Sequence, residues 1–97
     1  MEIKDLRDGM KRVNVEATVV EKGQPRQVMS RFKDETLSVA DAKVEDGSGS
    51  IKLTLWNEQI ALVKVNDKIR IENGYITSYK GEIQLNIGKF GKLVVNP

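Results

Sequence analysis

The only tryptophan of the chain lies on the polar side of an alternating segment, residues 51–56. Lys52, Thr54 and Trp56 share one parity of this segment. The other parity is aliphatic throughout: Ile51, Leu53 and Leu55. Successive side chains of a strand point to opposite faces, so the aliphatic parity predicts the side that faces a core. A tryptophan needed only for packing should share that side. Its position beside a lysine instead suggests a surface that binds planar rings and anions.

Two tyrosines repeat this placement further along the chain. Tyr75 and Tyr79 share one parity, opposite to that of Ile76. The face of an aromatic ring can stack on any nucleic-acid base, at about 1–3 kcal/mol per base. Three such platforms would contribute roughly 3–9 kcal/mol before ordering costs, and about 8 kcal/mol corresponds to a dissociation constant near 1 μM. The three aromatics therefore predict a binding surface for single-stranded nucleic acid.

Cations are unevenly distributed along a chain whose net charge is only +2. Residues 22–33 contain four cations and no acid, together with an aromatic that could wedge against a base. Three or four phosphate contacts predict a slope of about −2 to −3 when the logarithm of the binding constant is plotted against that of the salt concentration. Two amides on the outward parity of the last strand can form hydrogen bonds with base edges or backbone. The predicted nucleic-acid-binding residues are Trp56, Tyr75, Tyr79, Lys52, Lys80, Arg26, Arg31, Lys33, Phe32, Gln84 and Asn86.

The composition excludes several kinds of site. The chain has no cysteine and no histidine, so it has no disulfide or thiolate zinc site and lacks the commonest general base. It also lacks a glycine-rich phosphate loop and a nucleophile elbow. We therefore expect a binding protein without enzymatic activity, metal or cofactor. The N-terminus has no apolar run typical of a secretory signal and no segment approaches the ~18 apolar residues of a membrane span, so the expected location is cytoplasmic and nucleoid-associated.

These side chains require a scaffold of short strands. Alternating apolar residues predict five strands, over residues 11–22, 36–45, 51–56, 69–79 and 82–87. A short helix over residues 58–64 would follow the third strand, and a Lys80-Gly81 turn would join the last two strands. This order predicts an all-β fold, a five-stranded Greek-key OB-fold barrel with a short helix between strands 3 and 4; another small barrel, such as an SH3-like one, is the alternative. Residues 1–97 would form one domain, with residues 1–10 as an N-terminal cap.

Several local features are expected within this plan. The segment after the first strand is predicted as a long loop, and such loops in compact domains are often functional. A change of apolar parity within residues 36–45 suggests a bulge or a crossing between two sheet faces. Asn57 would cap the helix, Arg70 would add a cation beside the binding face, and residues 93–95 would form an added edge segment. The helix residues expected to face the core are Ile60, Leu62 and Val63.

Three runs of the chain resemble a known family. They are Ile51-Lys52-Leu53-Thr54-Leu55-Trp56, Ile71-Glu72-Asn73-Gly74-Tyr75 and Tyr79-Lys80-Gly81-Glu82-Ile83-Gln84-Leu85-Asn86. Together they are similar to an archaeal single-stranded-DNA-binding protein of the replication protein A type, and the resemblance covers about residues 10–90. It implies an OB fold that binds single-stranded DNA by base stacking, in replication, repair or recombination. It also implies stacking roles for Trp56, Tyr75 and Tyr79, and a DNA-contacting loop at Arg26-Gln27.

The chain departs from this resemblance in ways that bear on its partners. Position 75 is a tyrosine, where some relatives have tryptophan, so weaker stacking is expected there. The flexible tail that many relatives use to recruit partners and the zinc-binding cysteines of some larger members are absent, which argues against such recruitment and fits a single module of a longer protein. The expected partners are single-stranded DNA and, beside it, other OB domains or replication and repair proteins. Two further functions remain open for the same residues: an RNA-binding OB module, and a protein-interaction or assembly domain whose aromatics form an interface.

Overall fold

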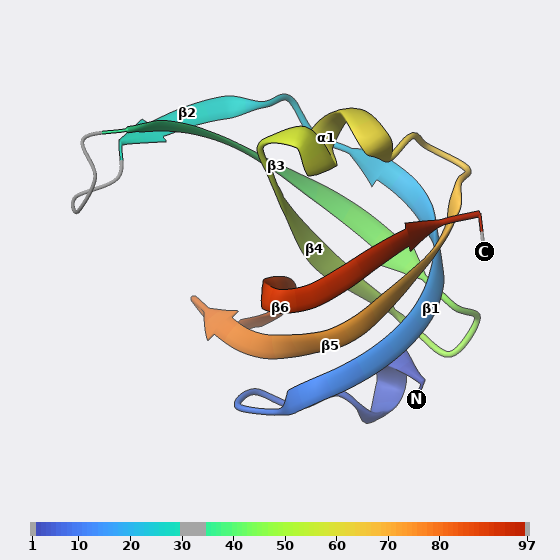
Figure 1. Ribbon diagram of the computed structural model, residues 1–97. Coiled ribbons are helices and arrows are strands. Elements are labelled where there is room, and N and C mark those ends of the chain that lie inside the picture. Colours follow the sequence, from blue (N-terminus) through green and yellow to red (C-terminus); the bar gives the residue numbers. More distant parts are fainter. Residues whose placement is uncertain (1, 30–34, 97) are drawn as a thin grey trace.

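In the computed structural model, which describes residues 2–29 and 35–96, five strands close into a barrel (Figure 1). They are β1 (Lys11–Lys22), β3 (Thr36–Glu45), β4 (Ser50–Trp56), β5 (Lys68–Tyr79) and β6 (Glu82–Val95). Their order is β1-β5-β6-β4-β3, and pairing of β1 with β3 closes the ring. The β4–β6 pair is parallel and the others are antiparallel. The predicted five-stranded barrel is confirmed.

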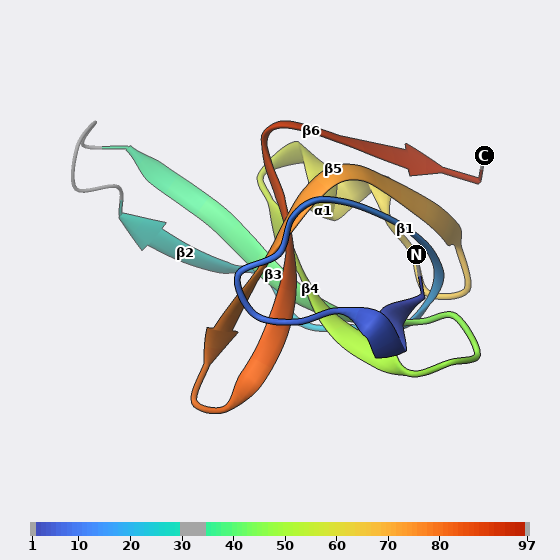
Figure 2. The same cartoon turned by 90° about the horizontal axis from the view of Figure 1, so that it is seen from below.

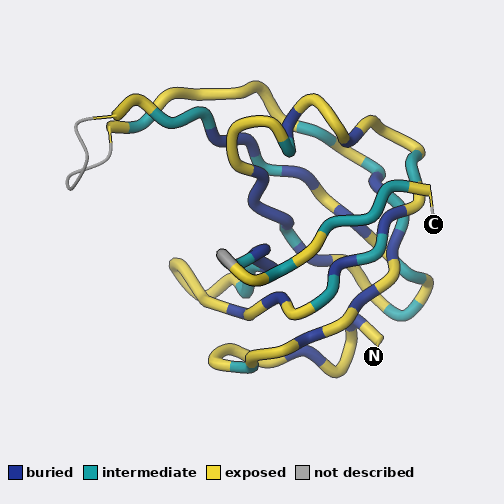
Figure 3. The backbone as a smooth tube through the Cα atoms, in the orientation of Figure 1, coloured by how far each residue is buried: buried dark blue, intermediate teal, exposed yellow. Residues whose placement is uncertain are grey.

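A sixth strand lies in the segment predicted as a long loop. β2 (Arg26–Met29) pairs with β3 from Arg26↔Val39 to Met29↔Thr36 and forms an arm that leaves the barrel. Figure 2 shows this arm and the β5–β6 hairpin projecting on the same side of the barrel. Residues of β2 are mostly exposed, whereas buried positions follow the barrel strands (Figure 3). The arm is therefore held by its backbone pairing with β3 and extends one edge of the barrel into solvent.

Aliphatic side chains from every barrel strand fill the interior. On β4, Leu53 and Leu55 are completely buried and Ile51 nearly so, whereas Trp56 on the other parity is 37% exposed. The alternation predicted for this strand is thus confirmed. Core residues of the other strands include Val15, Val19, Ala40, Val44, Ile69, Ile71, Ile76 and Leu85. The aromatic residues of β4 and β5 are left for the outer face.

Short helices cover the two ends of the barrel (Figure 1). At one end, η1 (Ile3–Asp5) buries Ile3 and is followed by buried Leu6, as expected for an N-terminal cap. At the other end lies α1 (Glu58–Leu62), which contributes buried Ile60. The predicted helix is thus present, in its predicted place in the chain, and is shorter than expected.

Two expectations for this helix are wrong. Asn57 precedes α1 with φ 52°, and its side-chain oxygen accepts the Ser38 N–H at 3.1 Å instead of capping the helix. Leu62 is 56% exposed, because the helix ends there and the chain turns to extended backbone at Val63. Val63 is completely buried. Asn57 therefore ties the helix start to β3, while Val63 anchors the exit.

The curvature of the barrel comes from irregularities in β1 and β5. Of the two alternatives expected in β3, a bulge or a crossing between sheet faces, the bulge is wrong: β3 pairs without interruption with β4, and the register shift lies in β1 between Val19 and Glu21. The change of parity in β3 arises because Val39 is 2% exposed on the outer face, directly opposite Trp56. Val39 therefore points to the outer face and is nevertheless buried.

A register change at Asn73-Gly74 brings β5 close to β6. The β5–β6 pairing shifts between Glu72 and Gly74, and Asn73 has φ 57°. A Cβ at Gly74 would lie 2.9 Å from the Asn86 carbonyl oxygen, so only glycine fits. The shift sets the outward parity of Tyr75 and Tyr79.

The last strand runs further than expected. A tight turn with positive φ at Lys80 and Gly81 opens β6, which continues to Val95. The expected separate edge segment, residues 93–95, is thus part of β6 and pairs with Ile69–Ile71 of β5. Leu93 and Val95 pack against the core. This long strand explains why the β5–β6 pair is a main wall of the barrel.

The turn between β3 and β4 is tied to the N-terminal cap by one carboxylate. Asp46 Oδ2 accepts the Ile3 N–H at 2.9 Å, while Oδ1 accepts the Ser48 N–H at 2.9 Å and the Ser48 hydroxyl at 2.6 Å. The hydroxyl, with backbone N–H donors, lowers the pKa of Asp46 from 3.8 to about 2.

Within the described residues, no helix is long and apolar enough to span a bilayer.

Candidate nucleic-acid interface

A groove of about 540 Å³ lies over β4, between the β2–β3 arm and the β5–β6 hairpin. Its lining residues are Arg26, Val28, Val39, Asp41, Lys52, Thr54, Trp56, Thr77, Ser78, Tyr79, Gln84 and Asn86. Six of the eleven residues predicted from the sequence are among them: Arg26, Lys52, Trp56, Tyr79, Gln84 and Asn86. Aromatic, cationic and amide side chains from four strands thus meet in one concave site.

Strand register explains how residues distant in sequence meet here. Trp56 lies opposite Val39 on β3, and Val39 lies opposite Arg26 on β2. Further along β4, Lys52 pairs in register with Gln84 of β6, which pairs with Thr77 of β5. The row of Thr54, which lies opposite Asp41 on β3 and Asn86 on β6, runs between these two rows. The cations therefore come from two strands, and polar side chains of β5 and β6 face them.

Trp56 and Tyr79 both line the groove, from β4 and from β5. Trp56 is 37% exposed, and its backbone N–H donates to Gln59 Oε1 at 3.0 Å at the start of α1. Tyr79 is 62% exposed. Lys80 does not line the groove; its Nζ lies 5.3 Å from the centroid of the Tyr79 ring. This cation–π contact places a positive charge beside the tyrosine platform.

Tyr75 lies next to the groove without lining it. It pairs in register with Asn86, which does line it, and it is 39% exposed. Its ring rests on β6 at Gly88, where a Cβ would approach Tyr75 Cε1 to 3.2 Å. Gly88 was not among the predicted residues. An isolated glycine within a strand pattern is the signal that could have indicated a close approach there.

The floor of the groove is polar and largely buried. Thr54 and Asn86 pair in register and are 7% and 9% exposed. Asn86 Nδ2 donates to Thr77 Oγ1 at 3.0 Å and to the Gln84 carbonyl at 3.3 Å. Both amide hydrogens of Asn86 are thus engaged within the protein. Its side-chain oxygen is therefore the atom suited to a ligand.

An acid that the sequence reasoning missed lies between the two groove cations. Asp41 Oδ2 is 3.3 Å from Arg26 Nη1 and 3.8 Å from Lys52 Nζ. Asp41 alternates with buried Ala40 and Ala42 on β3, and its partners depend on the register of three strands. The groove therefore contains its own counter-ion.

Other predicted cations lie outside the groove. Arg70, expected beside the binding face, forms ion pairs with Glu16 at 3.7 Å and Glu72 at 3.4 Å on the β1–β5 surface. That expectation is wrong, because the register shift of β5 separates this half of the strand from Tyr75 and Tyr79. Arg31, Phe32 and Lys33 lie outside the described residues.

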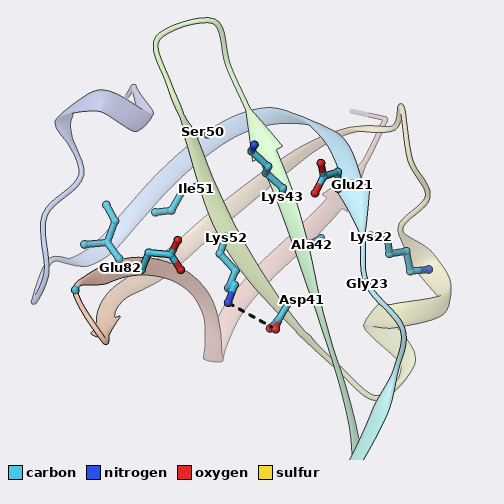
Figure 4. A pocket seen from close by; sticks show the side chains of 12 residues that line it. Glu21, Lys22, Gly23, Asp41, Ala42, Lys43, Ser50, Ile51, Lys52 and Glu82 are labelled. Carbon is cyan, nitrogen blue, oxygen red and sulfur yellow. Dashed lines mark ion pairs between the residues drawn. The ribbon is translucent and has the colours of Figure 1, made fainter.

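A second, larger hollow adjoins the groove. It measures about 920 Å³ and lies where the end of β1, the middle of β3 and the start of β4 face the β5–β6 turn (Figure 4). Asp41 and Lys52 line both hollows. Three lysines and three acids surround the second one: Lys22, Lys43, Lys52, Glu21, Asp41 and Glu82. Among the residues described here, no cluster of acidic side chains could hold a metal ion.

Comparison with known proteins adds a relative and two solved structures. The chain is 35% identical over 89 residues to the single-stranded DNA binding protein Ssb of Saccharolobus solfataricus, which covers 92% of this chain and 59% of the relative. The OB domain of Ta0387 from Thermoplasma acidophilum superimposes with a TM-score of 0.83 at 20% identity, covering 98% and 84% of the two chains. A replication protein A heterotrimer bound to ssDNA gives 0.75 at 17% identity, covering 98% and 24%.

The structural matches show the fold, a five-stranded OB barrel with one short helix. This agrees with the fold predicted from the sequence. The chain spans about three fifths of the length of its Saccharolobus relative. The model of the family "single-stranded DNA binding protein Ssb-like, OB fold" matches residues 7–95, nearly the whole chain. The chain therefore belongs to the Ssb-like family of OB-fold proteins.

Proposed function

We propose that this domain binds single-stranded DNA without catalysing a reaction. The observation that carries the proposal is the groove that Trp56 and Tyr79 line together with Arg26 and Lys52. Bases would stack on the aromatic rings, and the two cations would contact phosphates. Tyr75, next to Asn86, would extend the row of platforms beyond the groove. Membership of the Ssb-like family and the ssDNA in the replication protein A heterotrimer support this choice of ligand.

The polar floor suits this ligand as well. Buried Thr54 and Asn86 give the groove a fixed shape, and the side-chain oxygen of Asn86 can accept a hydrogen bond from a base. Stacking is tolerant of sequence because every base has a π-face. We therefore expect binding of many sequences, in a role in replication, repair or recombination beside other OB domains or replication and repair proteins.

Fluorescence of the single tryptophan tests the proposal directly. Adding a short oligo-dT should quench Trp56, because a base stacks on its ring. In anisotropy measurements with a labelled oligo-dT, Trp56→Ala should weaken binding about tenfold or more, from the loss of one stacking platform. Leu62→Ala is the matched control: Leu62 is an exposed apolar residue outside the groove, and this change should leave binding intact.

Two outcomes would overturn the proposal. One is the absence of quenching at low salt with tens of micromolar protein, about tenfold above the expected dissociation constant. The other is a clear preference for RNA in competition between oligonucleotides of matched sequence, which would assign the groove to RNA. The 2′-hydroxyl is what distinguishes the two ligands at a given site.

A further inference from the structure

The ion pairs inside the groove set a condition on phosphate binding. Arg26 and Lys52 share one acceptor atom, Asp41 Oδ2, at 3.3 and 3.8 Å. Figure 4 shows the Lys52 and Asp41 side chains directed toward each other at the junction of the two hollows. A phosphate that approaches either cation therefore competes with this carboxylate for the same positive charge.

Asp41 has opposite effects on the stability of the free protein and on the binding of a polyanion. Lys43 lies directly opposite Lys52 in the β3–β4 register, and like charges in such a pair repel. Asp41 lies two residues before Lys43 on the same outward parity and offsets this repulsion. The acid therefore stabilises the free groove, although it repels an incoming polyanion. Both effects act through the same two cations.

We propose that Asp41 is a built-in competitor for phosphate, a positioning residue that holds Arg26 and Lys52 over the groove and releases them to the DNA backbone. This inference rests on the proposed function of the groove. On binding, each cation exchanges a carboxylate oxygen for a phosphate oxygen, and Asp41 becomes an unpaired anion that attracts a salt cation. The competitor lowers affinity and makes binding less dependent on salt, since fewer ions are released overall.

Asp41→Asn tests this competition because it removes the charge and keeps the shape. With oligo-dT between about 50 and 200 mM salt, we expect binding to tighten about threefold to tenfold at the low end. The log–log salt slope should steepen by roughly one. The melting temperature of the free protein should fall, so affinity and stability change in opposite directions. Asp41→Ser, also uncharged, should give the same direction and provides a second variant if the first fails to fold.

Glu45→Gln is the matched control for net charge. Glu45 is an exposed acid of the same strand with the same outward parity, and it lines neither hollow. Its loss should change affinity and salt slope much less than the loss of Asp41. Equal effects of the two substitutions would mean that overall charge is responsible, and would overturn the proposal.

A double-mutant cycle separates competition from simple support. If Asp41 competes, Lys52→Gln weakens binding more in the Asp41→Asn background than in the native protein, because Lys52 is then fully available to phosphate. An equal or smaller loss in that background overturns the proposal. Native protein that fails to bind oligo-dT at all would instead overturn the proposed function, so the two failures are distinguishable.

Discussion

Gly88 is the residue on which the position of the third aromatic depends. The Tyr75 ring lies against β6, where a Cβ at position 88 would meet Tyr75 Cε1 at 3.2 Å and Cδ1 at 3.4 Å. The shorter distance is tighter than ordinary van der Waals contact, so a side chain at this position would shift the ring by a few tenths of an ångström. Gly88 is not one of the glycines with positive φ, which are Gly9, Gly47 and Gly81. Its role is therefore the space it leaves, not backbone freedom.

Gly88→Ala should weaken oligo-dT binding about threefold to tenfold with little loss of stability, because it tilts one of three stacking platforms. Anisotropy titration and a thermal melt measure the two effects. Gly49→Ala is the control, since the nearest atom to its Cβ would be Ile3 Cγ2 at 3.7 Å, an ordinary contact. Unchanged affinity of the Gly88 variant would show that Tyr75 takes no part in binding.

Asp41 and Asn86 show the limit of residue-level reasoning from sequence. Outward parity was predicted for Asn86 on β6, which does line the groove, whereas Asp41 was not among the predicted residues. The contacts of these two side chains could not be predicted from the sequence. The ion pairs of Asp41 and the hydrogen bonds of Asn86 depend on which strands are neighbours and in which register. Residue type and alternation predict which face a side chain occupies. Only the pairing of strands decides what it meets there.

At the level of elements, the β3–β4 turn and η1 act as one unit through Asp46. The lowered pKa means that the ionised carboxylate is favoured in the folded chain. The stabilisation is therefore fully present above about pH 4 and is lost as the pH falls toward 2. Folding of the N-terminal cap onto the barrel should follow the same dependence, since Ile3 is one of the donors.

Asp46→Asn should lower the melting temperature at pH 7 by about 4–8 °C, from the loss of about 1 kcal/mol in charge-assisted hydrogen bonds. The gap between variant and native protein should close as the pH falls from about 4 to 2. Glu45→Gln, which removes a neighbouring charge and none of these bonds, should show no such window. A gap that stays constant across this range would contradict the role assigned to Asp46.

Element prediction succeeded where apolar alternation was strong and failed where backbone pairing alone holds the chain. The five barrel strands and the helix were predicted because each buries a regular apolar face. β2 was missed because Arg26–Met29 has no buried face and is formed by pairing with β3 outside the core. The orientation of Leu62 was predicted wrongly because it depends on where a five-residue helix stops.

At the scale of the whole molecule, barrel closure divides the surface into two different faces. On one side the β2–β3 arm and the β5–β6 hairpin enclose the aromatic groove. On the other side Arg70 forms ion pairs with Glu16 and Glu72. The net charge of +2 does not reveal this division. The family could be identified from sequence because the strands that carry the groove also carry the resemblance. The extent of the groove required the fold.

A ¹H–¹⁵N NMR titration of the native protein with a short oligo-dT tests the central claim most directly. If the groove binds DNA, chemical-shift changes will concentrate on the groove, at the Trp56 indole and at the amides of Thr54, Tyr79 and Gln84. Signals of Glu16 and Arg70, on the opposite face, should stay in place. Shifts centred on that opposite face, or none at saturating oligonucleotide, would contradict the assignment of the aromatic groove as the DNA-binding site.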